Sequence, residues 1–305
     1  MKVFVTGATG FVGRPLVAAL LARGDQVTVM TRSAARAQDL GATQVVEGEL
    51  ETPGPWREAL AGHDAIVHLA GESVAAHRWD ARQKQIIRDS RVEATRALVE
   101  ALAALPLETR PRTLIGASGV DYYPFAGGPM DDDEVTEADP PGDEFLARVC
   151  RDWERETTAA EGHHLRVVRL RIGTVFGKGG GALDKIVPSF KLFAGGKVGN
   201  GKQWFSWIHR DDVVAIILAA LDDAAYTGAI NCVTDSVRYA AFAKVLGHLL
   251  HRPSFWRVPG FALKLAVGEL SVVLLNGRRV VPTALAARGY RFKYAQLADA
   301  LARSL

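Results

Sequence analysis

Cysteine is scarce in this sequence, with only Cys150 and Cys232 among 305 residues. The two lie far apart, and neither belongs to a Cys-x-x-Cys pair or has a histidine at metal-ligand spacing. A disulfide framework or a zinc site would need more cysteines at closer spacing. The acid run 131–134 also lacks the spaced glycine and distal glutamate of a calcium loop. The sequence therefore predicts two buried thiols and no metal site.

Long apolar runs and an excess of one charge are missing too. No apolar stretch approaches the roughly 20 residues that a membrane span needs, and the N-terminus shows none of the regions of a secretory signal. The formal net charge is +3, and the Lys and Arg residues are dispersed. These absences predict a cytoplasmic protein without a membrane or nucleic-acid partner, and they leave small anionic ligands open.

What the sequence does contain, at its start, is an apolar run that breaks into regularly spaced glycines. Residues 2–6 read Lys-Val-Phe-Val-Thr, and Gly7, Gly10 and Gly13 follow. This pattern is typical of a buried strand, a tight turn and a helix that together bind a dinucleotide. Gly7 would allow the turn, Gly10 the close approach of a pyrophosphate, and Gly13 the packing of helix on strand. The alternative is a helix N-terminus in another kind of α/β protein.

Strand-like and helix-like segments then alternate along the chain. Further strands are expected at 26–31, 42–47, 65–70, 112–117 and 165–171, and the longest helical pattern is at 82–105. Such alternation predicts an α/β fold with a doubly wound parallel sheet of the NAD(P)-binding Rossmann-like type. The strand ends at 31–32, 70–72 and 118–123 should open onto one crevice, because ligands bind beyond the carboxyl ends of such strands.

The end of the second strand bears on the choice of dinucleotide. An NAD site usually has an acidic residue there, about 20 residues past the glycines, which binds the ribose hydroxyls. This sequence has Thr31 and Arg32 instead. A guanidinium and a hydroxyl favour a 2′-phosphate, so we predict NADP(H) over NAD(H). The alternative is that Arg32 is a solvated loop residue.

The chain divides into two unequal parts. Residues 1–176 carry the expected dinucleotide-binding domain, and its irregular segment 118–142 is long enough to be functional. From Gly177 on, glycines and short helix and strand patterns replace the regular alternation. We expect 177–305 to form a smaller, mixed lobe for the substrate that leans on the crevice and returns some strands and helices to the first domain.

Together these motifs resemble the extended short-chain dehydrogenases/reductases, the NAD(P)-dependent epimerase/dehydratase superfamily. The likeness rests on the glycine turn, the strand end at 68–71, the Ser118 loop and the segment 207–212. The sequences at 70–72, 88–91, 122–123, 140–143, 179–183 and 203–209 narrow it to an atypical branch of "epimerase family proteins", sometimes labelled cell-division suppressors. The stretch from about 255 to 305 resembles the C-terminal domain of unknown function of that branch.

The resemblance implies a serine and a Tyr-x-x-x-Lys pair as acid/base groups beside a nicotinamide that exchanges a hydride. Ser118 stands at the serine position. Leu146 and Cys150 stand where the tyrosine and the lysine are expected, and neither can do their chemistry. Tyr122 or Tyr123 is our candidate for the proton donor. The alternative is that both rings form the floor of the nicotinamide pocket.

The glycine and strand-end patterns and the resemblance assign further residues to ligands. Cofactor contacts are expected from Gly7, Thr9, Gly10, Phe11, Gly13, Thr31, Arg32, His68, Leu69, Ala70, Arg91 and Thr174, and substrate contacts from Glu72, Trp207 and His209. The alternatives are a packed strand residue for His68, a surface ion pair for Arg91, and a lobe core for Trp207 and His209.

Two functions from different classes fit these observations. The first is an NADP(H)-dependent oxidoreductase or epimerase-like enzyme that acts on a small polar substrate. The second is a regulatory protein that senses NADP(H) without turnover and signals through a partner. Ser118 favours the enzyme, and the missing Tyr-x-x-x-Lys pair favours the sensor. Helices that flank the fourth and fifth strands form a dimer interface in many relatives of this superfamily, so a homodimer is also expected.

Overall fold

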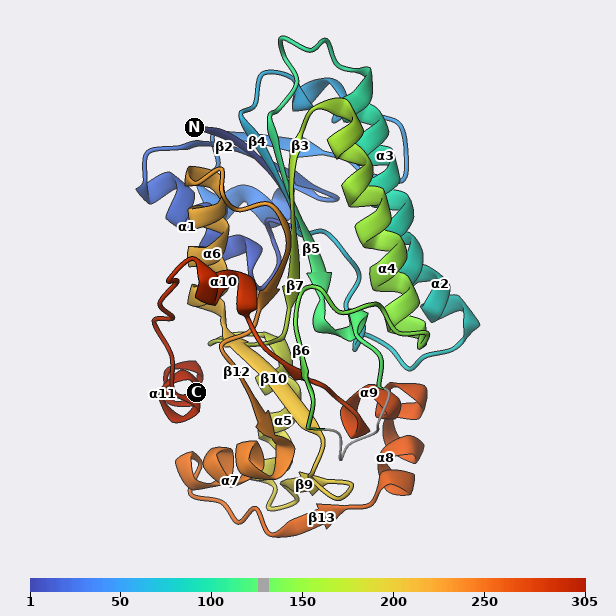
Figure 1. The fold of residues 1–305 in the computed structure, drawn as a ribbon, viewed down its shortest axis with the longest axis vertical. Coiled ribbons are helices and arrows are strands. Elements are labelled where there is room, and N and C mark those ends of the chain that lie inside the picture. The colour runs from blue at the N-terminus through green and yellow to red at the C-terminus, as the bar shows by residue number, and fades with distance from the viewer. Residues whose placement is uncertain (126–131) are drawn as a thin grey trace.

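Seven parallel strands form the central sheet of the molecule (Figure 1). They are β1 Lys2–Thr6, β2 Gln26–Thr31, β3 Gln44–Glu47, β4 Ala65–His68, β5 Thr113–Gly119, β7 Arg166–Ile172 and β11 Gly228–Cys232. The computed structural model describes residues 1–125 and 132–305, and its strand order is β11-β7-β5-β4-β1-β2-β3. The predicted α/β fold with a parallel, Rossmann-like sheet is confirmed.

Helices cover both faces of this sheet, as a parallel sheet requires. The main ones are α1 Gly13–Ala22, α3 Val92–Ala104, α4 Phe145–Thr158 and α6 Arg210–Asp222. α1 and α6 share one core with the sheet, while α3 and α4 lie on the other face. Because successive strand residues point to opposite faces, Val3 and Val5 enter the first core and Phe4 enters the second.

The helical pattern at 82–105 forms two helices, α2 (Ala81–Asp89) and α3, rather than one. In a continuous helix the backbone N–H of Arg91 would donate to the carbonyl of Ile87. Here it donates to the carbonyl of Arg88 at 3.0 Å, and the guanidinium of Arg91 donates to the Ile87 carbonyl, also at 3.0 Å. The Ile87 carbonyl thus accepts a hydrogen bond from the side chain of Arg91 instead of from its backbone N–H, and the helix is interrupted at this point.

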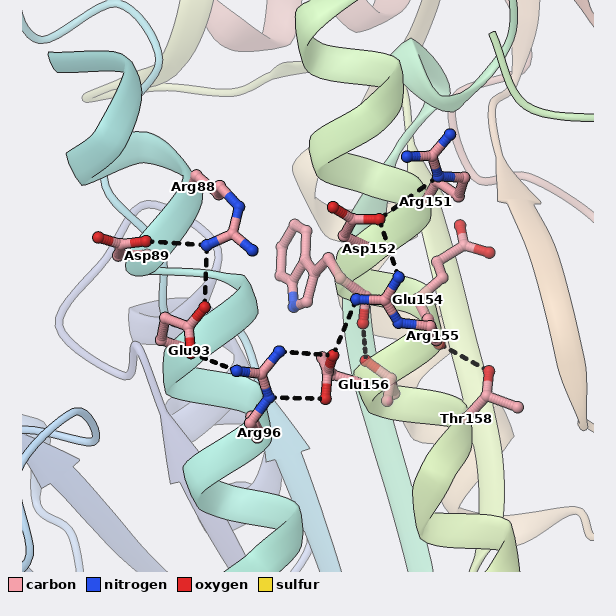
Figure 2. A network of polar contacts seen from close by, with 12 residues as sticks. Arg88, Asp89, Glu93, Arg96, Arg151, Asp152, Glu154, Arg155, Glu156 and Thr158 are labelled. Atoms are coloured by element: carbon pink, nitrogen blue, oxygen red, sulfur yellow. Dashed lines mark hydrogen bonds and ion pairs between the residues drawn. The ribbon is translucent and has the colours of Figure 1, made fainter. Parts of the chain in front are cut away.

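Ion pairs join α2, α3 and α4 along their outer surface (Figure 2). Arg96 on α3 reaches Glu156 on α4 at 3.0 Å and Glu93 at 2.7 Å, and Arg88 reaches Glu93 at 2.9 Å. We call these four residues the ion ladder. Each pair is partly exposed, so its contribution to stability is small, about 0–1 kcal/mol.

A smaller lobe follows the sheet and is built from short elements. Its strands are β6 Glu134–Val135, β8 Thr174–Phe176, β9 Gly196–Val198, β10 Trp204–His209, β12 Asp235–Arg238, β13 Trp256–Val258 and β14 Arg279–Val280. Its helices are α5 Gly181–Lys191, α7 Tyr239–Leu249, α8 Gly260–Val267, α9 Ser271–Leu275, α10 Thr283–Ala287 and α11 Leu297–Ser304. β8, β10 and β12 form one sheet, with Phe176, Trp207 and Phe242 in the core behind it.

Parts of the second half of the chain return to the large sheet. β11 is its outer strand, and α6 and α10 cover it. β11 cannot be recognised from the sequence, because the five residues that begin with Gly228 show no clear alternation. β6 pairs with β14, far along the chain. Glu137 accepts hydrogen bonds from the backbone N–H groups of Asn231 and Ala284, and the Asn231 side chain donates to the Val281 carbonyl.

No helix within residues 1–125 and 132–305 is long and apolar enough to cross a membrane. Over the same residues, no group of three His, Cys, Asp or Glu side chains is placed to hold a metal ion. Asp131, the first residue of the acid run, lies outside the described residues.

The strand order reverses beside β1. The chain first adds β2 and β3 on one side of β1, then crosses to β4 on the other side. The loops after β1 and β4 therefore leave in different directions and open a crevice at their carboxyl ends, which is where open α/β sheets bind ligands.

Candidate functional site

A cavity of about 620 Å³ lies at the carboxyl ends of β1, β2 and β4. Eight of the residues predicted to contact cofactor or substrate line it, namely Gly7, Thr9, Gly10, Thr31, Arg32, Leu69, Ala70 and Glu72. The cavity is also lined by residues that the sequence analysis did not single out, among them Met30, Arg36, Gly48, Glu49, Leu50, Glu51, Ser73 and Ser90. The strand ends at 31–32 and 70–72 thus share one crevice.

The glycine turn forms the inner wall of this cavity. Gly7 has φ +71°, and a Cβ there would lie 2.6 Å from the carbonyl carbon of Leu69. A Cβ on Gly13 would lie 2.2 Å from the oxygen of Gly7, so α1 packs directly on the turn. Around a Cβ on Gly10, only the Gly7 oxygen would be near, at 3.1 Å. The wall at Gly10 is therefore bare backbone, which is what close approach of a ligand requires.

Charged groups of both signs line the cavity, and the start of α1 favours an anion at the glycine turn. α1 begins at Gly13 with no acidic residue in its first turn, so the positive end of its dipole faces the turn unopposed. Arg32 and Arg36 line the far end of the cavity, and Glu49 and Glu51 line it as well. Arg36 was missed because it is five residues past the strand end. It lies in the 3-10 helix 34–40 and lines the same cavity as Arg32.

His68 supports the cavity from behind. Its side chain is fully buried, with Nδ1 2.7 Å from Thr6 Oγ1 and Nε2 3.0 Å from Thr95 Oγ1. Thr6 Oγ1 in turn accepts the backbone N–H of Ala70 at 3.3 Å. Burial lowers the pKa of His68 to about 4, so the ring is neutral near pH 7. The imidazole thus positions the cavity wall and does not line it.

Arg91, Asp121 and Cys150 meet near the ends of β4 and β5. The guanidinium carbon of Arg91 would lie 3.4 Å from a Cβ on Gly71, which lines the cavity, and 5.3 Å from the centre of the Trp153 ring. Burial raises the pKa of Asp121 to about 6, and the charge of Arg91 opposes that rise. Asp121 was missed because the sequence analysis considered only the tyrosines that follow it.

The three predicted catalytic residues, Ser118, Tyr122 and Tyr123, lie around a buried ion pair between Glu154 and Arg171. Glu154 accepts from Ser118 Oγ at 2.7 Å and from Arg171 Nε at 2.8 Å. Arg171 also donates to the hydroxyl of Tyr123 at 2.9 Å, and that hydroxyl donates to Asn231 Oδ1 at 2.6 Å. Burial raises the pKa of Tyr123 to about 12. These hydrogen bonds hold both hydroxyl groups inside the protein.

Tyr122 stands on the other side of the same ion pair. The guanidinium carbon of Arg171 lies 3.5 Å from the centre of its ring. Tyr122 lines a second cavity of about 480 Å³ beside α4, together with Arg151, Arg155 and Arg169. Neither Tyr122, Tyr123 nor Ser118 lines the cavity at β1 and β4, so the strand end at 118–123 does not share that crevice as expected.

Hydrophobic packing occupies the positions where the superfamily resemblance expects the tyrosine and the lysine. Leu146 packs with Trp79 and Ile87, and Leu270 of the smaller lobe closes the cluster. Burial raises the pKa of Cys150 to about 12, so its thiol stays neutral. No acid/base pair of the Tyr-x-x-x-Lys kind is formed on α4.

Four other predicted residues do not line the cavity. Trp207 is fully buried and stacks on Phe176 in the lobe core at 5.7 Å between ring centres, which leaves no ring face for a substrate. His209 is buried, and its Nδ1 accepts the backbone N–H of Asp211 at the start of α6. Phe11 packs against the glycine turn 177–181 of the lobe. Thr174 pairs with Trp207 in the small sheet.

Comparison with known proteins matches both parts of the chain to family models. Residues 3–232 match the NAD dependent epimerase/dehydratase family. Residues 258–304 match a domain of unknown function, DUF1731.

Individual relatives match over nearly the whole length. The chain is 40% identical to the chloroplastic epimerase family protein SDR39U1 homolog of Arabidopsis thaliana over 99% of this chain and 86% of the relative. It is 35% identical to the epimerase family protein YfhF of Bacillus subtilis over 99% and 97%. A crystal structure of the human epimerase family protein SDR39U1 with NADPH matches at TM-score 0.82 and 32% identity, over 100% of this chain and 99% of the other. On this evidence the chain belongs to the NAD dependent epimerase/dehydratase family, in company with the epimerase family proteins.

Proposed function

We propose that this protein binds NADP(H) in the cavity at β1, β2 and β4. The observation that carries this proposal is the glycine turn, where bare backbone at Gly10 and the start of α1 face the same space. A diphosphate there would meet backbone N–H groups and the positive end of a helix dipole. The crystallised human relative contains NADPH, which supports the same assignment.

The phosphorylated form is favoured by the far end of the cavity. Arg32, which directly follows β2 where an NAD site would have an acidic residue, lines it together with Arg36 of the 3-10 helix 34–40. Glu47, at the end of β3, is bound through Oε2 to the backbone N–H of Ala34 at 2.7 Å. This acidic side chain orders the loop that carries both arginines. We infer that Arg32 and Arg36 bind the 2′-phosphate.

We further propose that the protein is an oxidoreductase or epimerase-like enzyme for a small polar substrate. A bound nicotinamide supplies the hydride exchange, and the chain must then move a proton. Asp121 is our candidate for that task because it interacts with Arg91, whose guanidinium lies beside Gly71 of the cavity wall. Its pKa of about 6 also lies near neutral pH, whereas that of Tyr123 is about 12. Glu72 lines the cavity and is the expected substrate contact.

The alternative function is an NADP(H) sensor without turnover. One observation favours it, which is that Leu146 and Cys150 form part of the packed interior and Ser118 is bound to Glu154. A protein built this way would signal through a partner. A cytoplasmic location and a homodimer stay predictions.

Two measurements test these proposals in order. Isothermal titration with NADPH and NADH should give tighter binding of NADPH, and equal affinities would contradict the role of Arg32 and Arg36. NADPH oxidation is then followed against a panel of carbonyl compounds and nucleotide sugars. Turnover that is lost in Asp121→Asn but kept in Tyr123→Phe supports the enzyme and the proton role of Asp121. Tight NADPH binding without turnover on any substrate supports the sensor.

A further inference from the structure

The far end of the smaller lobe has an unbalanced composition. The segments 185–210 and 236–268 each contain five Lys and Arg residues and no Asp or Glu. The first runs through α5, β9 and β10, and the second runs from β12 to the end of α8. Over the whole chain, by contrast, 37 basic residues are balanced by 34 acidic ones. Arg238 is paired with Asp132 and Arg210 lies over the Phe11 ring, and the other eight basic residues leave these two segments with a net positive charge.

Large apolar side chains are exposed in the same two segments. Six of them have between 53% and 78% of their surface exposed, namely Leu192, Phe193, Phe255, Trp256, Phe261 and Leu265. We call these six residues the lobe patch. Single exposed apolar residues are common, but a group of this size on one lobe marks an interaction surface.

The two segments are adjacent in space, so the lobe patch is one surface. β13 pairs with β9 in parallel, with Trp256 opposite Gly196. The guanidinium of Arg252 lies 4.6 Å from the centre of the Phe193 ring, which joins the end of α5 to the segment before β13. The rings of Phe255 and Trp256 are 5.1 Å apart. Figure 1 places β9, β13 and α8 at the same end of the molecule.

α8 completes the surface and is itself unusual. Its sequence is Gly-Phe-Ala-Leu-Lys-Leu-Ala-Val, yet none of its residues is fully buried. Leu263 packs against the lobe core, while Phe261 and Leu265 are 78% and 76% exposed. Residues four apart lie on the same face of a helix, so Phe261 and Leu265 point outward together. Lys264 beside them is also exposed.

We propose that the lobe patch docks onto an anionic lipid bilayer. Aromatic and aliphatic side chains beside lysines and arginines are the composition with which protein surfaces enter the headgroup layer of negatively charged membranes. Because the docking is adsorption at the surface, it needs no spanning helix. The expectation of no membrane partner considered only spans and leader segments, and the proposal departs from it. It is independent of NADP(H) binding.

The charges favour an anionic bilayer over a second copy of the chain as the partner of the lobe patch. In a twofold dimer the same patch lies on both sides of the interface, so two sets of cations without acids would face each other. An acidic protein would satisfy the charges, but it would need a site that encloses the apolar side chains. The apolar side chains of the lobe patch are instead exposed on α8, at β13 and at the end of α5. Each of these three groups can insert separately into the headgroup layer of a bilayer.

Flotation of the full chain with vesicles tests the proposal. Phosphatidylcholine vesicles with about 30% phosphatidylglycerol should carry the protein upward at low salt, vesicles of phosphatidylcholine alone should not, and high salt should release it. The fluorescence of Trp256 should shift to the blue on binding, and Trp256→Phe should remove the shift. The variant Phe255→Ser/Phe261→Ser/Leu265→Ser should bind about tenfold more weakly.

Matched variants separate docking from folding. Leu107 is 62% exposed outside the patch, so Leu107→Ser should bind like the parent protein. Lys197→Glu/Arg257→Glu/Lys264→Glu keeps the apolar side chains and should also lose binding. All variants are compared by thermal melting. Absence of binding to phosphatidylglycerol, equal binding by the patch variants, or a dimer in light scattering that the patch variants abolish would overturn the proposal.

Discussion

At the scale of single residues, the sequence predicted several side chains of the candidate site but only some of their surroundings. Gly7, Gly10 and Arg32 are predicted from their spacing, and they line one cavity in the structure. Ser118 and Tyr123 were expected together and are together, but their hydrogen-bond partners Glu154, Arg171 and Asn231 come from three distant elements. Spacing along a chain carries no information on such long-range partners, so it could not show that both hydroxyl groups are engaged.

Replacing Arg32 tests the coenzyme preference. Arg32→Ala should weaken NADPH binding by about 10- to 100-fold, because a charge-assisted hydrogen bond to phosphate contributes about 1.5–3 kcal/mol. NADH binding should change little, since NADH has no 2′-phosphate. Isothermal titration measures both. Arg82→Ala, an exposed arginine outside the cavity, is the control. An equal loss for the two coenzymes in Arg32→Ala would speak against this role.

His68 makes the stability of the protein depend on pH. Its pKa is about 4 in the folded chain, against an ordinary value of 6.5. At pH above 6.5 the ring is neutral in both the folded and the unfolded chain, so His68 imposes no penalty on the free energy of unfolding. As the pH falls from 6.5 to 4, the unfolded chain binds a proton that the folded chain cannot, and up to about 3 kcal/mol of stability is lost.

Urea denaturation at several pH values between 7.5 and 4 measures this loss. His68→Gln can still hydrogen-bond to Thr6 and Thr95 but does not titrate, so its stability should fall less on acidification. His77→Gln, at an exposed position, should behave like the parent protein. The same slope in parent and His68→Gln would show that another group is responsible.

At the scale of elements, periodicity predicted the long strands and helices and only some of the short ones. β1, β2, β5, β7 and α4 are buried over several residues and show the alternation or helical spacing of their environment. β6 and β14 have two residues each, too few for any period. The break between α2 and α3 was missed because it depends on where the side chain of Arg91 turns. The direction of such a side chain is determined by packing and not by the local sequence pattern.

The glycine turn is the element most sensitive to a single added carbon. Gly13→Ala would place a Cβ 2.2 Å from the Gly7 oxygen, so β1 and α1 would have to separate. We expect a loss of about 2–4 kcal/mol in the free energy of unfolding. Gly162→Ala is the matched control, because a Cβ there meets nothing within 4 Å. Chemical denaturation of both variants checks the expectation, which an unchanged Gly13→Ala would contradict.

For the molecule as a whole, the alternation of strands and helices was enough to predict the fold class. It could not predict how the smaller lobe is interwoven with the sheet. β11 joins the large sheet from the second half of the chain, and α10 packs on it from near the C-terminus. These contacts connect residues far apart in sequence, so no local pattern indicates them, and they become visible only in the folded structure.

The expected homodimer through α3 and α4 would bury the ion ladder. Because Arg88, Glu93, Arg96 and Glu156 are already paired within one chain, the two ladders would meet as arrays of alternating charge. We therefore expect the dimer to weaken as the salt concentration rises from about 0.05 to 0.5 M. Sedimentation velocity measures the change. A monomer at low salt would contradict the dimer, and a dimer indifferent to salt would locate its interface elsewhere.

The pairing of β6 with β14 sets a constraint on synthesis. When Glu134–Val135 leaves the ribosome, its partner Arg279–Val280 has not yet been translated, and neither have Val281 and Ala284, which later bind Asn231 and Glu137. A nascent chain can assemble its first strands, but the pairing of β6 must wait until residues 279–284 have been translated. Glu134–Val135 therefore lacks its partner strand through most of synthesis, and this part of the fold forms late.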